Sequence, residues 1–276
     1  MLDFEFKSRY GIDDLVNIMK MLRSENGCPW DKVQTHESIR TDLIEEAYEV
    51  CEGIDANDPK MLREELGDLL MQVVFHSQIE TEQGNFNFDD VCNDICQKLV
   101  YRHPHVFGEV KADTEEEVLK NWDALKKAEK NQKTDTDTLE SVPKTFPALL
   151  RGEKVCKRAA RAGLQINSAK DCIDRIRSGL DELERSGLYE NGGVSDEKIA
   201  QIQQIVGDFA LSFCNLNRIL KIDGEKALTY STNRFIMGFR VLENEAAERG
   251  CSLDKLCEVF SKEELSRLVN IVISGQ

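Results

Sequence analysis

The chain has 276 residues, of which 41% are hydrophobic and 32% charged, with only 17 Gly and 5 Pro. This composition is typical of a helical protein and argues against an all-β protein, which needs many turns. The net charge of −15 disfavours binding to nucleic-acid backbones. No apolar run reaches the ~20 residues of a membrane span, and the charged N-terminus lacks a secretory signal. Nine cysteines without a C-x-x-C pair fit a reducing compartment, so we expect a cytoplasmic protein with no membrane or nucleic-acid partner.

Apolar spacing predicts helices throughout the first half of the chain. They cover residues 12–22, 38–54, 59–82, 88–101 and 114–130. Pro59 fits the first turn of its helix, and Thr114 with Glu117 fits a capping box. Residues 131–143 are polar and lack apolar periodicity. We therefore predict a linker at 136–143 between domains of residues 1–135 and 144–276.

The second half repeats the helical pattern. Helices are predicted over residues 147–163, 169–186, 196–220, 225–249 and 262–273. The segment EELGDLLMQVVF (64–75) aligns with QIVGDFALSFCN (204–215), and Gly67-Asp68 recurs as Gly207-Asp208. A duplicated domain explains this repeat, with chance similarity of two amphipathic helices as the alternative. We expect an all-α protein with two related helical bundles.

Acidic residues gather on two successive helices of the first half. Glu45, Glu46 and Glu49 share overlapping faces of one helix, and Glu65 and Asp68 are three apart on the next. Like charges at these spacings repel, so a convergent cluster would be protonated unless cations neutralised it. Oxygen-only ligands suit hard cations, chiefly Mg²⁺ and otherwise Mn²⁺. The alternative is a solvated acidic face.

Two features of the second acidic helix favour a metal site. Its carboxylates border the apolar stripe, because Leu66 and Leu69 interleave with Glu65 and Asp68. Gly67 in mid-helix costs about 1 kcal/mol relative to Ala, so it needs a reason. Close approach of a neighbouring helix or a ligand would supply that reason.

Several motifs in order resemble the MazG family of all-α nucleoside triphosphate pyrophosphohydrolases. The family signature is E-E-x-x-E, a short spacer and then E-x-x-D, which here reads Glu45-Glu46-Ala-Tyr-Glu49 and Glu65-Leu-Gly-Asp68. The flanking segments GCPWDKVQTH (27–36), YRHPHVFGEV (101–110) and NWDALKKAEK (121–130) are also similar to the family. The resemblance covers residues 12–135 well and the rest of the chain more loosely.

The resemblance implies hydrolysis of a nucleoside triphosphate to a monophosphate and pyrophosphate. By analogy, Glu46, Glu49, Glu65 and Asp68 would bind Mg²⁺. Glu45 and Glu46 would be catalytic, with Glu45 binding a further ion or orienting the attacking water.

The resemblance also implies a nucleotide pocket. Lys98 and Arg102 share a helix face, as do Trp122 and Lys126. The three cations would meet phosphate oxygens, and Trp122 would stack on the base. Trp30 follows a Gly-Cys-Pro turn and would either contact the base or anchor the core.

The second half departs from the signature. It reads Ser178-Gly179-Leu180-Asp181-Glu182 where E-E-x-x-E would fall, and Ile205-Val206-Gly207-Asp208 where E-x-x-D would fall. Only Glu182 and Asp208 remain of the cluster. We therefore expect a second domain that folds but is not catalytic.

Taken together, the sequence predicts Mg²⁺-dependent hydrolysis between the α and β phosphates, clearing noncanonical or excess nucleotides. A homodimer is expected, since helix pairs of this size usually complete their core by pairing. The alternatives are a dUTPase-like or phosphoribosyl-ATP pyrophosphohydrolase-like enzyme of the same fold, or a nonenzymatic nucleotide-sensing module. His36 and His76 receive no role.

Overall fold

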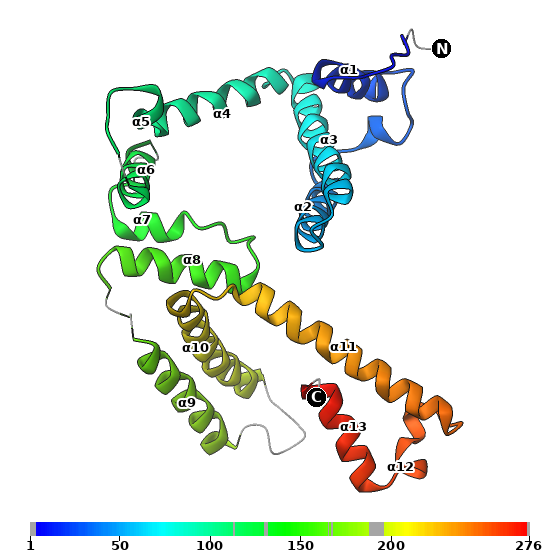
Figure 1. The fold of residues 1–276 in the computed structure, drawn as a ribbon. Helices are drawn as coiled ribbons and strands as arrows, with labels where there is room; N and C mark the ends of the chain where they lie inside the picture. The colour runs from blue at the N-terminus through cyan, green and yellow to red at the C-terminus, as the bar shows by residue number, and fades with distance from the viewer. Residues whose placement is uncertain are drawn as a thin grey trace. The chain divides into compact units, whose positions relative to one another are not determined.

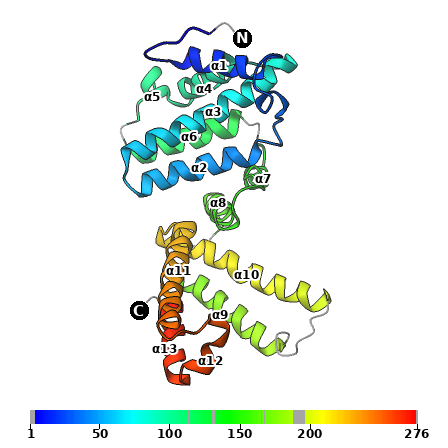
Figure 2. The same cartoon turned by 90° about the vertical axis from the view of Figure 1, so that its right-hand side faces the viewer.

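The structure, a computed structural model, describes residues 4–112, 114–129, 132–164, 166, 168–187 and 196–274. These residues form helices and no strand, which confirms the all-α prediction (Figures 1 and 2). The chain separates into two compact units, Met1–Lys126 and Lys127–Gln276. The predicted helix end at Lys130 and the first residue of the polar stretch, Asn131, lie outside the described residues.

The first unit is built around one helical hairpin. The helix α2 is followed after the short turn 56–58 by α3, and the two pack along their length (Figure 2). Asp58 caps α3 by accepting hydrogen bonds from the backbone of Lys60 and Met61, and Pro59 occupies the first turn as predicted. The helices of this unit are α1 (Ile12–Arg23), α2 (Arg40–Asp55), α3 (Pro59–Gln83), α4 (Phe88–Arg102), α5 (Pro104–Phe107) and α6 (Glu115–Glu129), with a 3₁₀ turn η1 (Asp31–Val33).

The hydrophobic core of the first unit lies where α1 and the start of α2 meet the second half of α3. Its buried members are Met19, Ile39, Val74, Phe75 and Ile79. Ile39 is the residue before α2 and is 1% exposed, so the entry of that helix is fixed by apolar burial. The first half of α3, which carries the acidic residues, contributes no buried side chain to this core.

The second unit also contains a long helix pair. The helix α10 has 25 residues, as α3 does, and packs on the 18-residue α9. This likeness fits a duplicated domain, which stays a prediction. The elements are α7 (Asp135–Glu140), α8 (Ala148–Arg161), α9 (Ala169–Ser186), α10 (Asp196–Leu220), α11 (Gly224–Glu248), η2 (Leu253–Lys255), α12 (Leu256–Val259) and α13 (Lys262–Ser274).

Three cysteines of the second unit are core residues. Cys156, Cys172 and Cys214 are buried on α8, α9 and α10. Burial raises the pKa of the Cys214 thiol to about 11, so this thiol is neutral near pH 7. In the first unit the cysteines are not core residues, since Cys51 and Cys96 are exposed.

Residues 135–140, which lie largely within the predicted linker, form the short helix α7. Thr134 and Asp137 make a reciprocal capping box: the Asp137 amide donates to the Thr134 hydroxyl, and the Thr134 amide donates to the Asp137 carboxylate. Arg158 then fixes the end of this helix through Thr138 and Ser141. A helix this short has no apolar period to detect, and the boundary between the units lies before it rather than at 135.

None of the helices in the described part of the chain has the length and apolar character needed to span a membrane.

Candidate active site

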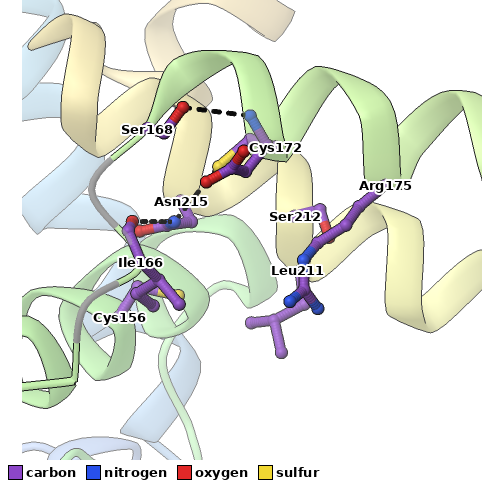
Figure 3. Close-up of a pocket in the computed structure, with 9 residues that line it drawn as sticks. Cys156, Ile166, Ser168, Cys172, Arg175, Leu211, Ser212 and Asn215 are labelled. Atoms are coloured by element: carbon purple, nitrogen blue, oxygen red, sulfur yellow. Dashed lines mark hydrogen bonds between the residues drawn. The ribbon is translucent and has the colours of Figure 1, made fainter.

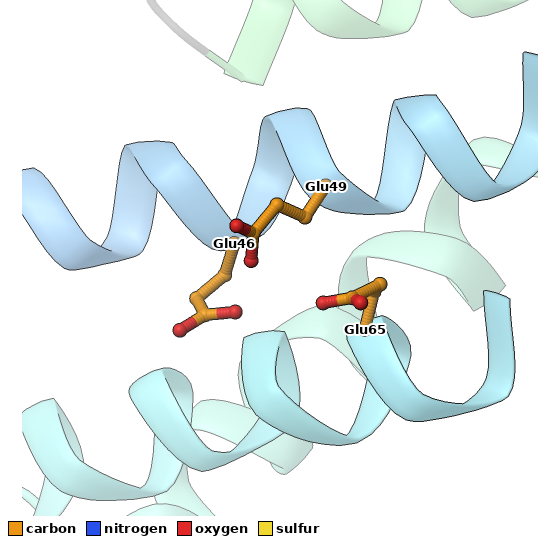
Figure 4. A group of neighbouring side chains, drawn as sticks. All are labelled: Glu46, Glu49 and Glu65. Atoms are coloured by element: carbon orange, nitrogen blue, oxygen red, sulfur yellow. The ribbon is translucent and has the colours of Figure 1, made fainter. Parts of the chain in front are cut away.

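Three glutamates converge between α2 and α3. Glu46 and Glu49 extend from α2 and Glu65 from α3, and one carboxylate oxygen of each lies within 4.8 Å of those of the other two (Figure 4). Glu46 and Glu65 are half-buried, whereas Glu49 is exposed. The structure therefore brings the two predicted acidic faces together, as the helical spacing suggested.

Gly53, to which the sequence pattern gave no role, allows α2 and α3 to approach closely. A Cβ atom on Gly53 of α2 would lie 3.0 Å from the backbone N and Cα of Leu62 on α3. The sequence pattern draws attention to Gly67 instead, yet no atom of the described residues lies within 4 Å of a Cβ added there. Within the described part of the chain, close packing of a neighbouring helix therefore does not explain Gly67. The helix crossing is set at Gly53, near the turn of the hairpin.

The cluster is electrostatically strained in the absence of a cation. The pKa of Glu46 is raised by burial and then by the charges of Asp68, Glu49 and Glu65. The pKa of Glu65 is raised by burial and then by Glu49, Asp68 and Glu64. Asp68 is thus close enough to interact with both residues. Oxygen donors that repel one another are the donor set of a hard divalent cation, so these side chains fit Mg²⁺.

Glu45 occupies a different position from the other predicted ligands. It is exposed on α2, and its carboxylate is outside the group formed by Glu46, Glu49 and Glu65. Its predicted role with a further ion or with the attacking water stays a prediction.

Two of the predicted nucleotide-binding cations meet at Trp122. The guanidinium of Arg102 on α4 lies 5.4 Å from the ring centroid, and the ammonium of Lys126 lies 5.0 Å from it. Both are cation–π distances. Lys98 is exposed one turn before Arg102 on α4. The structure thus groups Arg102, Trp122 and Lys126, and the Trp122 ring contacts both cationic side chains.

Trp30 lies in the loop between α1 and η1. It is 57% exposed in the turn before η1, and its backbone oxygen accepts a hydrogen bond from Gln34. This exposure does not support a core-anchor role within the chain.

The second unit has no comparable cluster among its described residues. A Cβ on Gly179, at the place of the first acidic motif, would lie 3.1 Å from the Cβ of Phe209 on α10. An aromatic side chain therefore packs against the α9 backbone beside Asp208. This packing supports the expectation that the second unit is not catalytic.

A small pocket of about 190 Å³ does occur in the second unit, where α8, α9 and α10 meet (Figure 3). The buried Asn215 at its wall donates to the Ile166 carbonyl at 2.8 Å and to the Cys172 sulfur at 3.2 Å. The Asn215 oxygen accepts from Arg218, and Ser168 caps α9. These polar groups satisfy one another, so they fix the helix junction. The sequence pattern did not reveal this pocket.

Fold and site together define an all-α protein with a carboxylate cluster on a helical hairpin. The model of the MazG nucleotide pyrophosphohydrolase domain matches residues 34–107, which contain the whole acidic cluster and the Lys98–Arg102 pair. The chain is 40% identical to a nucleoside triphosphate pyrophosphohydrolase of Escherichia coli K12, over 88% of this chain and 90% of the relative. It is 37% identical to the Thermotoga maritima "Nucleoside triphosphate pyrophosphohydrolase/pyrophosphatase MazG", with the same coverage of each. A Mycobacterium tuberculosis relative with the name of the E. coli protein is 37% identical over 61% of this chain and 50% of its own. This chain belongs to the MazG family of nucleotide pyrophosphohydrolases.

Proposed function

We propose that the chain hydrolyses nucleoside triphosphates to nucleoside monophosphates and pyrophosphate, with Mg²⁺ held by Glu46, Glu49, Glu65 and Asp68. The observation that carries this proposal is the convergence of carboxylates from α2 and α3 in a chain of this family. The relatives from E. coli and T. maritima have names that state this activity.

In the proposed reaction the oxygen of water forms a new bond to the α-phosphorus. The bond from that phosphorus to the α–β bridging oxygen breaks, and the bridging oxygen leaves with pyrophosphate. Glu45 orients the attacking water, and a carboxylate of the cluster accepts its proton. A bound divalent cation would supply Lewis acidity and neutralise charge on the phosphates. Burial and neighbouring carboxylates raise the pKa of Glu46 above its ordinary value in the metal-free cluster, which makes this carboxylate a better proton acceptor.

We assign the phosphates to Lys98, Arg102 and Lys126. The Trp122 ring lies against Arg102 and Lys126, so it holds two cations side by side for a polyanion. Trp30, exposed in its turn, is the residue we assign to the base. The cytoplasmic location is likewise a proposal that rests on the sequence.

A homodimer is part of the proposal. The hairpin exposes apolar side chains next to the acidic residues: Tyr48 is 58% and Leu66 49% exposed, with Ile44 and Leu70 nearby on the same helices. A second copy that covered this surface would remove apolar area from water and would explain the open side of Gly67. Sedimentation analysis should give twice the chain mass, and Leu66→Arg should give the single-chain mass. A monomeric wild type would contradict this part of the proposal.

Pyrophosphate release from a panel of nucleoside and deoxynucleoside triphosphates tests the function. With Mg²⁺, wild-type protein should release pyrophosphate, and EDTA should stop the release. Activity confined to dUTP or to phosphoribosyl-ATP would favour the related enzymes of the same fold. No release from any of these substrates would favour a nonenzymatic nucleotide sensor and contradict the proposal.

A further inference from the structure

His36 and His76 join the segment before α2 to the middle of α3. The two Nδ1 atoms are 2.7 Å apart. The Nε2 atom of His36 lies 2.5 Å from the Glu80 carboxylate. The other oxygen of Glu80 accepts from the Asn85 side chain at 2.6 Å. A chain of hydrogen bonds therefore runs from Asn85 through Glu80 and His36 to His76.

The imidazole rings meet edge to edge in one plane. Their planes differ by 8° and their centroids are 5.0 Å apart. The centroid separation exceeds the 2.7 Å between the Nδ1 atoms by about two ring radii. The two nitrogens therefore lie on the line that joins the centroids and point directly at each other. Stacked rings could not place two nitrogens this way. This is the geometry of an N–H···N hydrogen bond, which holds one proton between the two nitrogens.

The neighbours of the pair decide which nitrogen carries which proton. A carboxylate only accepts, so His36 Nε2 carries a proton toward Glu80. In the neutral pair, His36 Nδ1 is then an acceptor, and His76 Nδ1 must be the donor. This leaves Nε2 of His76 without a proton. That atom is buried and has no hydrogen-bond partner among the described residues, which is more tolerable for an acceptor than for an N–H group.

We propose that His36 and His76 are positioning residues, which hold segment 30–39 on α3 through one shared proton. The segment carries Trp30 at one end and leads into α2, the helix of Glu46 and Glu49, at the other. The consequence for nucleotide binding rests on the proposed function. The shared proton and the position of the segment do not depend on the proposed function.

A second anchor, an ion pair with backbone hydrogen bonds, holds the same segment. Arg23 of α1 pairs with Glu82 of α3 and donates to the backbone oxygens of Asp31 and Gln34. Because of this anchor, loss of the histidine contact should loosen the segment without unfolding the unit. The histidine contact can thus be lost while the Arg23 contact still holds the segment.

The charges around the pair come from each element that packs near it. Glu80 and Glu82 lie on α3, and Arg23 of α1 is neutralised by Glu82. Glu37 follows His36 in the turn and interacts with its charge, and α2 begins with Arg40. Among these charged groups, Glu80 is the one in hydrogen-bond contact with an imidazole of the pair.

Acid should open the contact. The neutral pair can take up one additional proton and keep its N–H···N hydrogen bond. A second additional proton would put N–H groups on both facing nitrogens, and the two imidazolium cations would repel each other. Burial, and then the charge of His36, lower the pKa of His76. A histidine with a lowered pKa favours the folded arrangement above its ordinary value, ~6.5, and this contribution is lost as the pH falls below it.

Nitrogen NMR of the full-length protein tests the shared proton. The chain has only four histidines, so His36→Phe and His76→Phe assign the signals. At pH 8 we expect His76 as the Nδ1–H form and His36 as the Nε2–H form. His76 in the Nε2–H form that free histidine prefers would overturn the proposal.

Two variants of His76 test positioning. His76→Phe removes the donor, whereas His76→Gln keeps an N–H for His36 and does not titrate. Hydrogen exchange at residues 34–39 should be faster by about fivefold in His76→Phe, as expected for one lost hydrogen bond, and near wild type in His76→Gln. Equal exchange in all three proteins would contradict a positioning role.

Kinetics then connect the pair to the proposed reaction. His76→Phe should raise KM for the nucleotide by up to about fivefold and leave kcat unchanged, because bound nucleotide restores the closed segment. The KM of the wild type should rise more steeply below pH 6.5 than that of His76→Gln. A fall in kcat at constant KM would overturn positioning. If no nucleotide is hydrolysed, the proposed function fails, while the NMR and exchange results still decide the inference.

Discussion

At the scale of single residues, the acidic cluster stores repulsion that a cation would relieve. Glu46 and Glu65 both have a raised pKa, caused first by burial and then by neighbouring carboxylates. A carboxyl group whose pKa is higher in the folded than in the unfolded protein favours folding while protonated. That contribution is lost as the pH rises above the folded value. At neutral pH, repulsion within this cluster should therefore lower the folding stability of the metal-free protein.

Glu46→Gln tests this electrostatic account. Without divalent cations at pH 7.5, the variant should melt roughly 1–2 °C above the wild type, because a repelling charge is removed. The difference should shrink toward pH 4, where the wild-type carboxyl group is protonated. Added Mg²⁺ should raise the Tm of the wild type more than that of the variant. Equal Mg²⁺ shifts in the two proteins, measured by calorimetry, would argue against a metal site at Glu46.

The spacing of the acidic residues could be predicted from the sequence, because positions three and four apart share a helix face. Their convergence could not, since it depends on how closely α2 and α3 approach at Gly53. The His36–His76 pair was missed because its members are 40 positions apart, and His36 precedes a helix rather than lying on its periodic face. Tertiary packing, not local pattern, brings such groups together.

At the scale of elements, the hairpin of α2 and α3 is what positions the site. Both helices have enough turns for apolar periodicity to show, and their predicted bounds differ from the observed ones by at most two residues. The same holds for α9 and α10, whose predicted bounds match the observed ones. Short elements such as α5 and α7 were missed, because caps and turn chemistry define them and no apolar stripe does.

Gly53→Ala and Gly67→Ala form a matched pair that tests this hairpin. The added methyl at Gly53 meets the α3 backbone at 3.0 Å, so the helices must shift, at a cost of roughly 1–3 kcal/mol in the free energy of unfolding. At Gly67 no described atom of the same chain lies within 4 Å, so in the single-chain Leu66→Arg background Ala should stabilise the helix by about 0.5–1 kcal/mol. Urea denaturation measures both. If the two variants are equally stable, the close approach at Gly53 is not what sets the crossing.

At the scale of the whole molecule, the two units share a helical plan and differ in their chemistry. The first has three carboxylates within reach of one cation, and the second has Phe209 packed on Gly179 at the corresponding place. The second unit keeps a buried core and satisfied polar contacts around Asn215. This contrast fits the expectation that the second unit folds without holding a metal site.

The most direct test of this account is pyrophosphate release by Glu49→Gln with Mg²⁺ and the best nucleotide of the substrate panel. Loss of one ligand of the cluster should lower the rate at least ~100-fold. Two variants serve as controls: Glu52→Gln, an exposed change on the same helix, and Asp208→Asn in the second unit, both expected within about twofold of wild type. Undiminished release by Glu49→Gln, or loss of release in Asp208→Asn, would contradict a single active site at α2 and α3.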